Sequence, residues 1–135
     1  MKTEPTFGHI KETCLYIKDI DKAEAFYHKT LGLPLVSKEP GRHIFFRAGT
    51  SMLLCFIAAN TKNETRFPAH YGEGKQHMAF GVAQEDYEAW KNRFISLGIM
   101  ITHEHTWTAQ LESFYFEDPD GNVLEVVPNE LWDSI

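Results

Sequence analysis

The sequence predicts an α+β fold in which two tandem β-α-β-β-β modules form a curled mixed sheet around a cleft. Short strands with period-2 alternation and one amphipathic helix occur in the same order in each half of the chain. The two helix ends carry the same signature, Leu31-Gly32-Leu33 and Leu97-Gly98-Ile99, which supports an internal repeat. Because modules of this size are too small to be stable alone, we expect them to pack together or to exchange between chains.

The first module is expected over about residues 9–57. Its first strand is predicted at residues 11–17, where apolar and polar side chains alternate. A helix is predicted to open at Asp21, because Glu24 three residues later completes a capping box, and Gly32 is a suitable residue just beyond its end. Three short strands separated by glycine-containing turns follow, at residues 35–38, 43–47 and 52–57.

The second module is expected over about residues 76–127, after a polar linker at 58–75 that is punctuated by glycine and proline. Its helix is predicted at 85–97, with an inward stripe of aromatic side chains. Its strands are predicted at residues 77–82, 100–103, 112–116 and 123–127. With a C-terminal tail at 128–135, we expect residues 1–135 to form one single domain.

The last predicted strand carries the most unusual residue of the chain. It follows a turn at residues 118–121, in which a proline fixes φ and a glycine allows the backbone conformation that ends the turn. Period-2 alternation then places Glu125 on a strand whose two faces are otherwise apolar. A lone buried carboxylate is unfavourable unless it is paired, protonated or bound to a cation. The repeat predicts that Glu12, Cys55, His77 and Glu125 occupy equivalent places in the two modules.

The composition excludes several classes of partner. The hydrophobic content of 43% is that of a globular chain, and a net charge of −6 without any Lys/Arg cluster argues against a nucleic-acid partner. No apolar run reaches the length of a membrane span, and the N-terminus lacks the apolar segment of a signal peptide. We therefore expect no membrane partner and a cytoplasmic location, in which Cys14 and Cys55 remain thiols.

Five segments match motifs of a known family, at residues 15–20, 25–27, 31–33, 76–80 and 113–125. In combination they resemble the vicinal oxygen chelate superfamily, which holds glyoxalase I, extradiol dioxygenases, fosfomycin-resistance enzymes and bleomycin-resistance proteins. The resemblance implies paired β-α-β-β-β modules around a divalent metal ion that chelates adjacent oxygens of a small-molecule substrate. It also implies a homodimer, because clefts in this superfamily are often completed by a partner chain.

The resemblance implies that Glu12, His77 and Glu125 are the metal ligands, and that Glu12 and Glu125 are also the catalytic residues. Each has a simpler alternative. Glu12 could be a solvated side chain near the chain start, His77 a hydrogen-bonded core histidine, and Glu125 a surface-facing or Arg-paired carboxylate. The small side chains of Ala79 and Gly81 favour the ligand interpretation of His77, because they leave room beside the imidazole.

This ligand set suits Zn, Mn, Ni, Fe or Mg, because one imidazole and two carboxylates do not select among these ions. The glyoxalase I pattern has a further Glu where this chain has Cys55, and extradiol dioxygenases use two histidines, so neither narrow assignment fits fully. The resemblance favours a metal-dependent lyase, isomerase, transferase or dioxygenase acting on a small oxygen-chelating or electrophilic substrate. The alternative is a metal-free binding protein of the bleomycin-resistance kind.

Two further features have mainly structural interpretations. Cys55 lies between Leu54 and Phe56 and is expected to be a packed thiol. His103 and His105 share a strand face and could bind a group together, but exposed decoration of an edge strand is the simpler interpretation.

Overall fold

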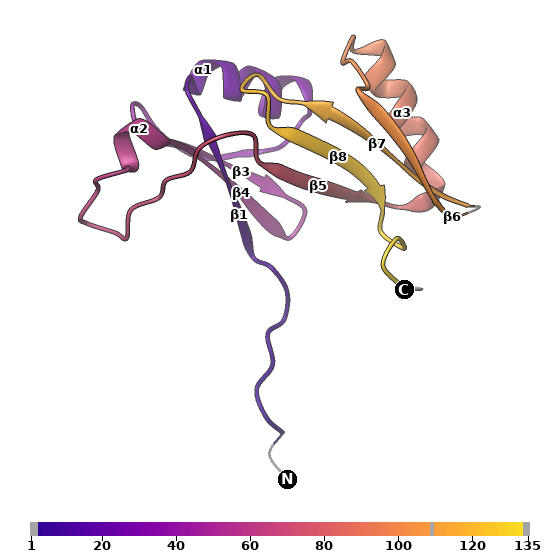
Figure 1. The fold of residues 1–135 in the computed structure, drawn as a ribbon, viewed down its shortest axis with the longest axis horizontal. Coiled ribbons are helices and arrows are strands. Elements are labelled where there is room, and N and C mark those ends of the chain that lie inside the picture. The colour runs from indigo at the N-terminus through magenta and orange to yellow at the C-terminus, as the bar shows by residue number, and fades with distance from the viewer. Residues whose placement is uncertain (1–2, 109, 134–135) are drawn as a thin grey trace.

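Over residues 3–108 and 110–133, the computed structural model forms eight strands in two sheets (Figure 1). The strands of the first sheet are β1 (Glu12–Ile17), β2 (Leu35–Glu39), β3 (His43–Ala48) and β4 (Ser51–Ile57). The strands of the second sheet are β5 (His77–Val82), β6 (His103–Thr108), β7 (Leu111–Glu117) and β8 (Val123–Pro128). Every predicted strand is present, but one of them is displaced.

The two sheets have the same internal order, β1-β4-β3-β2 and β5-β8-β7-β6. In each sheet the first strand of the module runs parallel to the last, and the other neighbours are antiparallel. The predicted α+β architecture of two tandem β-α-β-β-β modules is therefore confirmed. In the part of the chain that the structure describes, the sheets remain separate and do not close into one barrel.

The helical segments are α1 (Ile20–Ala23), η1 (Glu24–Thr30), α2 (Ala58–Thr61), η2 (Gln84–Asp86) and α3 (Tyr87–Ser96). Within 3–108 and 110–133, none is long and apolar enough to cross a membrane. The short helix α2 lies inside the segment that was predicted to be a linker without regular structure. It is placed by the hydrogen bond from the Asn60 side chain to the Gly41 carbonyl, at 2.7 Å, which no local sequence pattern indicates.

The first helix begins at a different cap from the predicted one. The Asp19 carboxylate accepts a hydrogen bond from the Lys22 backbone N–H at 3.1 Å, so Asp19 and not Asp21 is the N-cap. The helix then continues as the π-helical segment η1, where Leu31 N–H reaches back to the Phe26 carbonyl at 2.9 Å. The predicted capping box at Asp21 is therefore wrong, because an earlier aspartate reaches the same set of free N–H groups.

The strand predicted at residues 100–103 is β6, which begins only at His103. After α3, Gly98 has φ of 74° and reverses the chain, while Ile99 N–H bonds back to the Phe94 carbonyl at 3.0 Å. Ile99 and Ile101 then pack against the core. The apolar run that suggested a strand is thus the return from the helix, and pairing with β7 begins after it.

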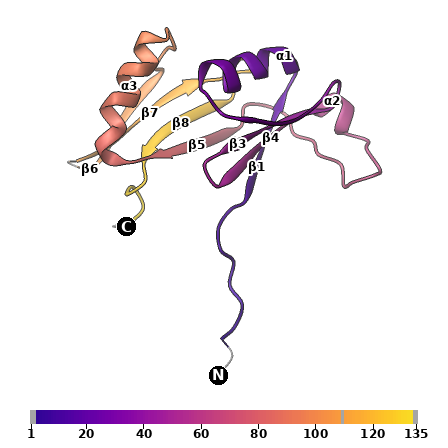
Figure 2. The same ribbon diagram turned by 180° about the vertical axis from the view of Figure 1, so that it is seen from behind.

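The core lies between the helices and one face of each sheet, and α1 and α3 lie on the same side of the sheets in both views (Figures 1 and 2). The aromatic rings of Tyr27 and Phe46 are 5.4 Å apart, and those of Phe94 and Phe116 are 4.7 Å apart. The opposite face of each sheet, which points away from these helices, is called the helix-free face below. Alternation along the strands means that every second residue projects onto it.

The turn before β8 is held by a buried carboxylate. Tyr27 donates its hydroxyl hydrogen to Asp118 Oδ2 at 2.6 Å, and the backbone N–H groups of Asp120 and Asn122 both donate to Asp118 Oδ1 at 2.9 Å. Burial raises the pKa of the Tyr27 hydroxyl, followed by the negative charge of nearby groups. Tyr27 therefore remains a hydrogen-bond donor, and it joins the helix of the first module to the turn of the second.

The same turn also contacts the first sheet directly. Lys18 N–H donates to Asp120 Oδ1 at 3.0 Å, and the Asn122 side-chain amide donates to the Tyr16 carbonyl at 3.2 Å. Asn122 Oδ1 in turn accepts from the backbone N–H of Gln76, at the start of β5. These bonds connect β1 to both ends of the second module and so fix where β5 and β8 begin.

Candidate functional site

His77 and Glu125 lie together on the helix-free face of the second sheet. In the parallel ladder of β5 and β8, His77 is opposite Val123, and Ala79 is opposite Glu125. The imidazole and the carboxylate are thus diagonal neighbours on adjacent strands, within reach of long side chains. His77 Nε2 lies 3.4 Å from Glu125 Oε1. The structure therefore brings together two of the three predicted ligands.

The hydrogen-bonding of His77 determines which nitrogen is free. Its Nδ1 lies 2.9 Å from the Val123 carbonyl oxygen. A carbonyl oxygen only accepts, so Nδ1 carries the hydrogen and Nε2 of the neutral ring keeps its lone pair. That lone pair points to an oxygen of Glu125, which is also an acceptor. A proton or a metal ion between the two atoms would satisfy both.

Glu125 is buried, with only 5% of its surface exposed. Its Oε2 finds no hydrogen-bond partner in residues 3–108 and 110–133. Tyr115 lies directly opposite Glu125 on β7. Burial raises the pKa of the Tyr115 hydroxyl, and the negative charge of Glu125 raises this pKa further. A buried carboxylate oxygen without a hydrogen-bond partner is unfavourable, and coordination to a bound cation would compensate for the missing bond.

The small, exposed side chain of Ala79 leaves space next to this pair on the same face of β5. Further along the strand, the place beside Gly81 is occupied by the side chain of Asn129, with which a Cβ atom at Gly81 would collide. Across the sheet, Tyr115 is opposite His103 on β6, and their rings are 5.6 Å apart. One cross-strand row thus carries small, acidic, phenolic and imidazole side chains in succession.

Glu12, the third predicted ligand, lies elsewhere in this chain. It is exposed at the first residue of β1, opposite Met52, on the other sheet. No group of three or more His, Cys, Asp or Glu side chains is close enough to hold a metal ion within the described ranges. A single chain therefore supplies the pair of His77 and Glu125 but does not bring Glu12 to it.

Cys55 is fully buried in the core, as predicted for a packed thiol, and burial raises the pKa of its thiol. Its predicted equivalence to Glu125 is wrong by one residue. The third residue of β1, Cys14, is opposite Leu54, and the third residue of β5, Ala79, is opposite Glu125. Leu54 is therefore the equivalent position, and a shift of one residue moves a side chain to the other face.

Aromatic stacking that the sequence interpretation did not predict covers much of the helix-free face of the first sheet. His70 stacks on Phe56 with ring centroids 4.4 Å apart, and His43 stacks on Phe45 at 4.0 Å. His70 belongs to the predicted linker, so no pattern of alternation could place it there. This face is filled by aromatic packing, and its positions equivalent to His77 and Glu125 hold Glu12 and Leu54.

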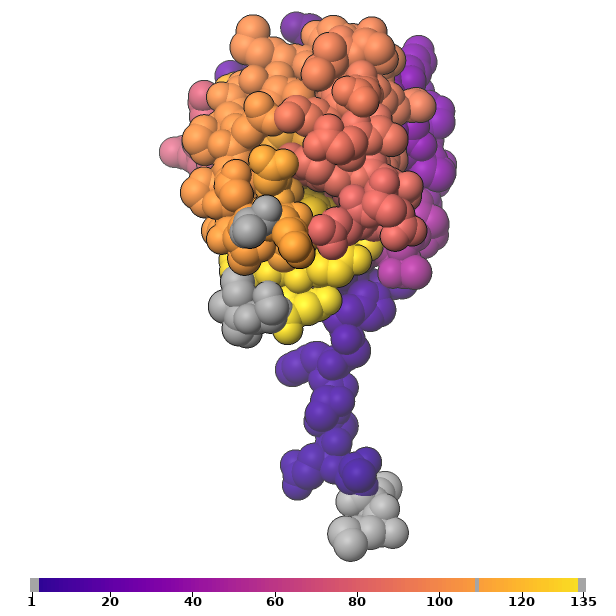
Figure 3. All heavy atoms as spheres, turned by 90° about the vertical axis from the view of Figure 1, so that its right-hand side faces the viewer, coloured from indigo at the N-terminus to yellow at the C-terminus, as the bar shows by residue number. Residues whose placement is uncertain are grey.

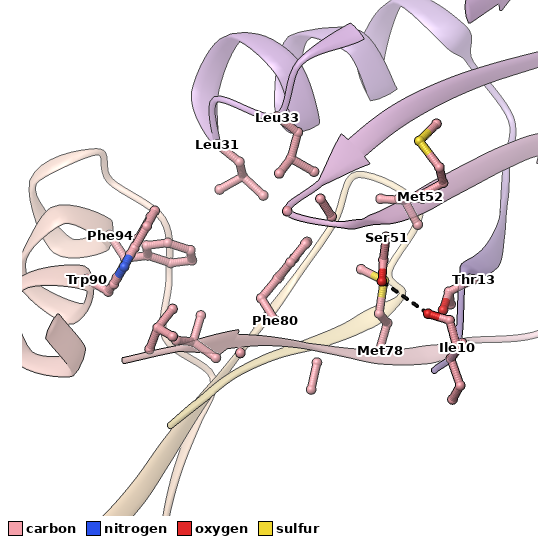
Figure 4. A pocket seen from close by; sticks show the side chains of 17 residues that line it. Ile10, Thr13, Leu31, Leu33, Ser51, Met52, Met78, Phe80, Trp90 and Phe94 are labelled. Carbon is pink, nitrogen blue, oxygen red and sulfur yellow. Dashed lines mark hydrogen bonds between the residues drawn. The ribbon is translucent and has the colours of Figure 1, made fainter. Parts of the chain in front are cut away.

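An apolar cavity of about 530 Å³ lies on the opposite side of β5 from His77 (Figure 4). Met78 and Phe80 point into it from β5, because they alternate with His77 along that strand. Its other walls come from the end of η1, the β3–β4 turn and α3, with Leu31, Leu33, Met52, Trp90 and Phe94. This cavity is separate from the pair of His77 and Glu125 and belongs to the junction between the modules.

Several known proteins are similar to this chain. Glutathione transferase FosA from Serratia marcescens is 30% identical over 115 residues, which cover 83% of this chain and 74% of that protein. Metallothiol transferase FosB from Shouchella clausii (strain KSM-K16) is 30% identical over 113 residues, covering 82% and 73%. The crystal structure of lactoylglutathione lyase from Agrobacterium tumefaciens matches with a TM-score of 0.88 and 38% identity, covering 94% of this chain and 98% of that one.

The family model also extends over both sheets, since it matches residues 6–126. This range includes β1, β5 and most of β8, and therefore the elements that carry all three predicted ligands. The repeated strand order and the match over nearly the whole chain lead to one family. The chain belongs to the Glyoxalase/Bleomycin resistance protein/Dioxygenase superfamily.

Proposed function

We propose that this protein is a divalent-metal-dependent enzyme in which His77 and Glu125 hold the ion. The observation that carries the proposal is the buried Glu125, whose Oε2 is unpaired and whose Oε1 lies 3.4 Å from His77 Nε2. Two acceptor atoms facing each other in a partly buried place are unfavourable in the absence of a cation. The bond from His77 Nδ1 to the Val123 carbonyl supports the ligand role, because metal-binding histidines usually donate their other N–H to such a partner.

The donor set fits Zn, Mn, Ni, Fe or Mg, since imidazole and carboxylate both bind these ions. Such an ion, when bound, acts as a Lewis acid that polarises a substrate oxygen. Tyr115 stays protonated because its pKa is raised, and it lies opposite Glu125 on β7, where its hydroxyl can help to orient the carboxylate. The small, exposed Ala79 leaves room on the same face for a small substrate with adjacent oxygens or an electrophilic centre.

We further propose that Glu12 of a second copy completes the site in a homodimer. Glu12 occupies the place on β1 that His77 occupies on β5, at the first residue of each parallel strand. If the first sheet of one copy faces the second sheet of the other, the two equivalent residues come to the same cleft. Glu12 would then be a third ligand, and a carboxylate there is suited to act as a general base.

The proposed reaction class is thiol-dependent transfer or lyase chemistry on a small molecule. Support comes from the names of the similar proteins, which are a glutathione transferase, a metallothiol transferase and a lactoylglutathione lyase. A second candidate is a metal-free protein that sequesters a small molecule. The observation that favours it is the separation of Glu12 from His77 and Glu125 within one chain.

The test begins with elemental analysis of protein purified without added metal, followed by titration of the metal-free form with Mn, Ni, Zn and Fe(II). We expect near-stoichiometric binding that is lost in Glu125→Gln and kept in the matched control Glu117→Gln. Glu117 is an exposed carboxylate on β7 whose neighbour is Lys75. If the protein bound none of these ions, the metal-dependent enzyme would be ruled out, and the second candidate, a metal-free protein that sequesters a small molecule, would take its place.

The shared site has its own test. Glu12→Gln and Glu125→Gln chains are each expected to lose tight binding, whereas co-expression of the two should restore one intact site per mixed dimer. The reason is that one cleft then receives both wild-type residues and the other receives neither. If the mixture binds no more metal than the separate variants, Glu12 is not supplied by a second copy.

A further inference from the structure

The N-terminal segment, residues 3–11, forms an arm that stands clear of the rest of the molecule (Figures 1 and 3). All of its residues are exposed, and the side chains of Phe7 and Ile10 are 103% and 77% exposed. The arm is fixed where it meets β4 and the turn before it, through hydrogen bonds from Ser51 Oγ to the Ile10 carbonyl, from Met52 N–H to the Lys11 carbonyl and from Lys11 Nζ to the Thr50 carbonyl. An aromatic side chain on such an arm leaves a large apolar surface in water.

A second group of exposed aromatic side chains lies on the helix-free face of the second sheet. His105 and Trp107 of β6 have ring centroids 4.5 Å apart, and Trp107 and Trp132 are 5.7 Å apart. Trp107 is held in place because its indole N–H donates to Ser113 Oγ at 3.0 Å. Trp132 is nevertheless 63% exposed. We call these two tryptophans the tryptophan ledge.

We propose that the arm of one copy lies across the second sheet of a second copy, with Phe7 packed on the tryptophan ledge of that copy. The proposal rests on the shared site described above, in which Glu12 of one copy meets His77 and Glu125 of the other. Glu12 directly follows the arm, so any arrangement that brings it to the second sheet of another copy also carries the arm there.

The lengths agree. Phe7 precedes Glu12 by five positions, so an extended arm places it roughly 17 Å away. On the sheet, the row of Glu125 leads across two strand spacings to His103, and Trp107 is four positions further along β6. Two spacings of about 4.8 Å and four rises of about 3.3 Å give a diagonal of roughly 16 Å. An arm anchored by Glu12 at the metal site therefore reaches the ledge.

The chemistry of the two surfaces also matches. Phe7 and Trp132 are both exposed aromatic side chains, and docking would remove both rings from water in offset or edge-to-face contact. Ala79, on the same face, is small and exposed and presents no bulky side chain to the arm. Exposed aromatic groups on two separate surfaces of one chain are typical of surfaces that meet in a symmetric interface.

The test uses two differently tagged chains that are co-expressed, both carrying Cys14→Ser so that only the buried Cys55 remains. One chain carries Thr6→Cys and the other Asp133→Cys, so that Phe7 and both tryptophans are kept, and a short bismaleimide reagent is added to the purified protein. In the matched control, Ile95→Cys replaces Asp133→Cys, because Ile95 is exposed on α3, on the opposite side of the sheet. We expect the mixed crosslinked dimer to form at least about tenfold faster than in the control, because docking raises the effective concentration of the two thiols.

Light scattering and metal titration of the same preparations separate the two levels of the proposal. A dimer with a metal site that depends on Glu12, but with equal crosslinking in test and control, would overturn the docking of the arm and leave the shared site intact. A monomer would overturn both. As a second measurement, Phe7→Ala should shift the tryptophan emission to longer wavelength, whereas Phe67→Ala in the exposed loop should leave it unchanged.

Discussion

The helix-free faces of the two sheets have the same strand order and opposite character. On the first sheet, His43, Phe45, Phe56 and His70 pack together, and Phe56 is almost completely buried. On the second sheet, the corresponding face presents His77, half exposed, beside a buried carboxylate with an unpaired oxygen. The same backbone arrangement therefore supports a packed surface in one module and a candidate metal site in the other.

The two histidines show what separates a structural imidazole from a candidate ligand. Arg42 donates to His43 Nδ1 at 2.6 Å, and His43 Nε2 therefore carries the hydrogen and donates to Ser37 Oγ at 3.0 Å. Both nitrogens of His43 are used. His77 uses only Nδ1, and its Nε2 faces an acceptor. Burial depth alone would have favoured His43 as the functional residue, whereas the available lone pair favours His77.

The largest expected effect is the difference in metal affinity between two single variants, in which either His77 or His43 is replaced by alanine. His77→Ala should weaken metal binding by about 100-fold or more, since losing a ligand is expected to exceed the effect of losing an outer-shell partner. His43→Ala should leave metal affinity unchanged and lower the midpoint of urea unfolding, because Arg42 Nη1 loses its acceptor and Ser37 Oγ loses its donor. Calorimetric titration and denaturation of both variants check this. Equal metal affinities in the two variants would remove the distinction between the two faces.

The next effect concerns the bond that joins the modules. Tyr27→Phe removes the donor to the buried Asp118, and losing a hydrogen bond to a charged group is expected to lower the free energy of unfolding by about 2 kcal/mol. Tyr71→Phe is the control, because Tyr71 donates to Glu73 in an exposed loop. Urea denaturation of both proteins gives the comparison. A midpoint for Tyr27→Phe equal to that of Tyr71→Phe would mean that this bond does not hold the two sheets together.

Much of the fold could be predicted from local patterns. The order of strands and helices follows from alternation, glycine turns and the repeated helix ends. The proximity of His77 and Glu125 follows as well, because the first and last strands of each module pair in parallel and both residues fall on one face. One-residue registers could not be predicted to the same degree. Cys55 and Leu54 show this. The residues around them on β4 are apolar on both faces, so the sequence does not indicate which of the two side chains faces the helices.

The rest depends on contacts between residues far apart in the sequence. The bond from Tyr27 to Asp118 and the stacking of His70 on Phe56 arise only when the modules and the linker have been placed. The position of Glu12 relative to the other predicted ligands also depends on long-range contacts. Its residue type and strand position could be predicted, but its distance from His77 depends on how two sheets are arranged, which no local pattern encodes.

A smaller effect is expected at Tyr115. Tyr115→Phe removes the hydroxyl next to Glu125 and should weaken metal binding by about tenfold, as for other groups that orient a ligand. Tyr16→Phe is the matched control, because Tyr16 lies on the helix-free face of the first sheet. Titration near pH 7 and near pH 9 adds a second readout. The raised pKa keeps Tyr115 protonated at both values, so the ratio between wild type and Tyr115→Phe should stay constant. A ratio that collapses at the higher pH would contradict this role.

The smallest expected effect is the contribution of His43 to the pH dependence of stability. Burial, followed by the positive charge of Arg42, lowers the pKa of His43 below its ordinary value of 6.5, although Glu39 acts in the opposite direction. A lowered pKa in the folded state means that the unfolded chain binds more protons, so this contribution to stability is present above pH 6.5 and is lost as the pH falls below it. The urea midpoint of the wild type should therefore fall between pH 7 and pH 5 more steeply than that of His43→Gln. If His43→Gln kept the wild-type slope, the assignment of a neutral, fully bonded imidazole to His43 would be wrong.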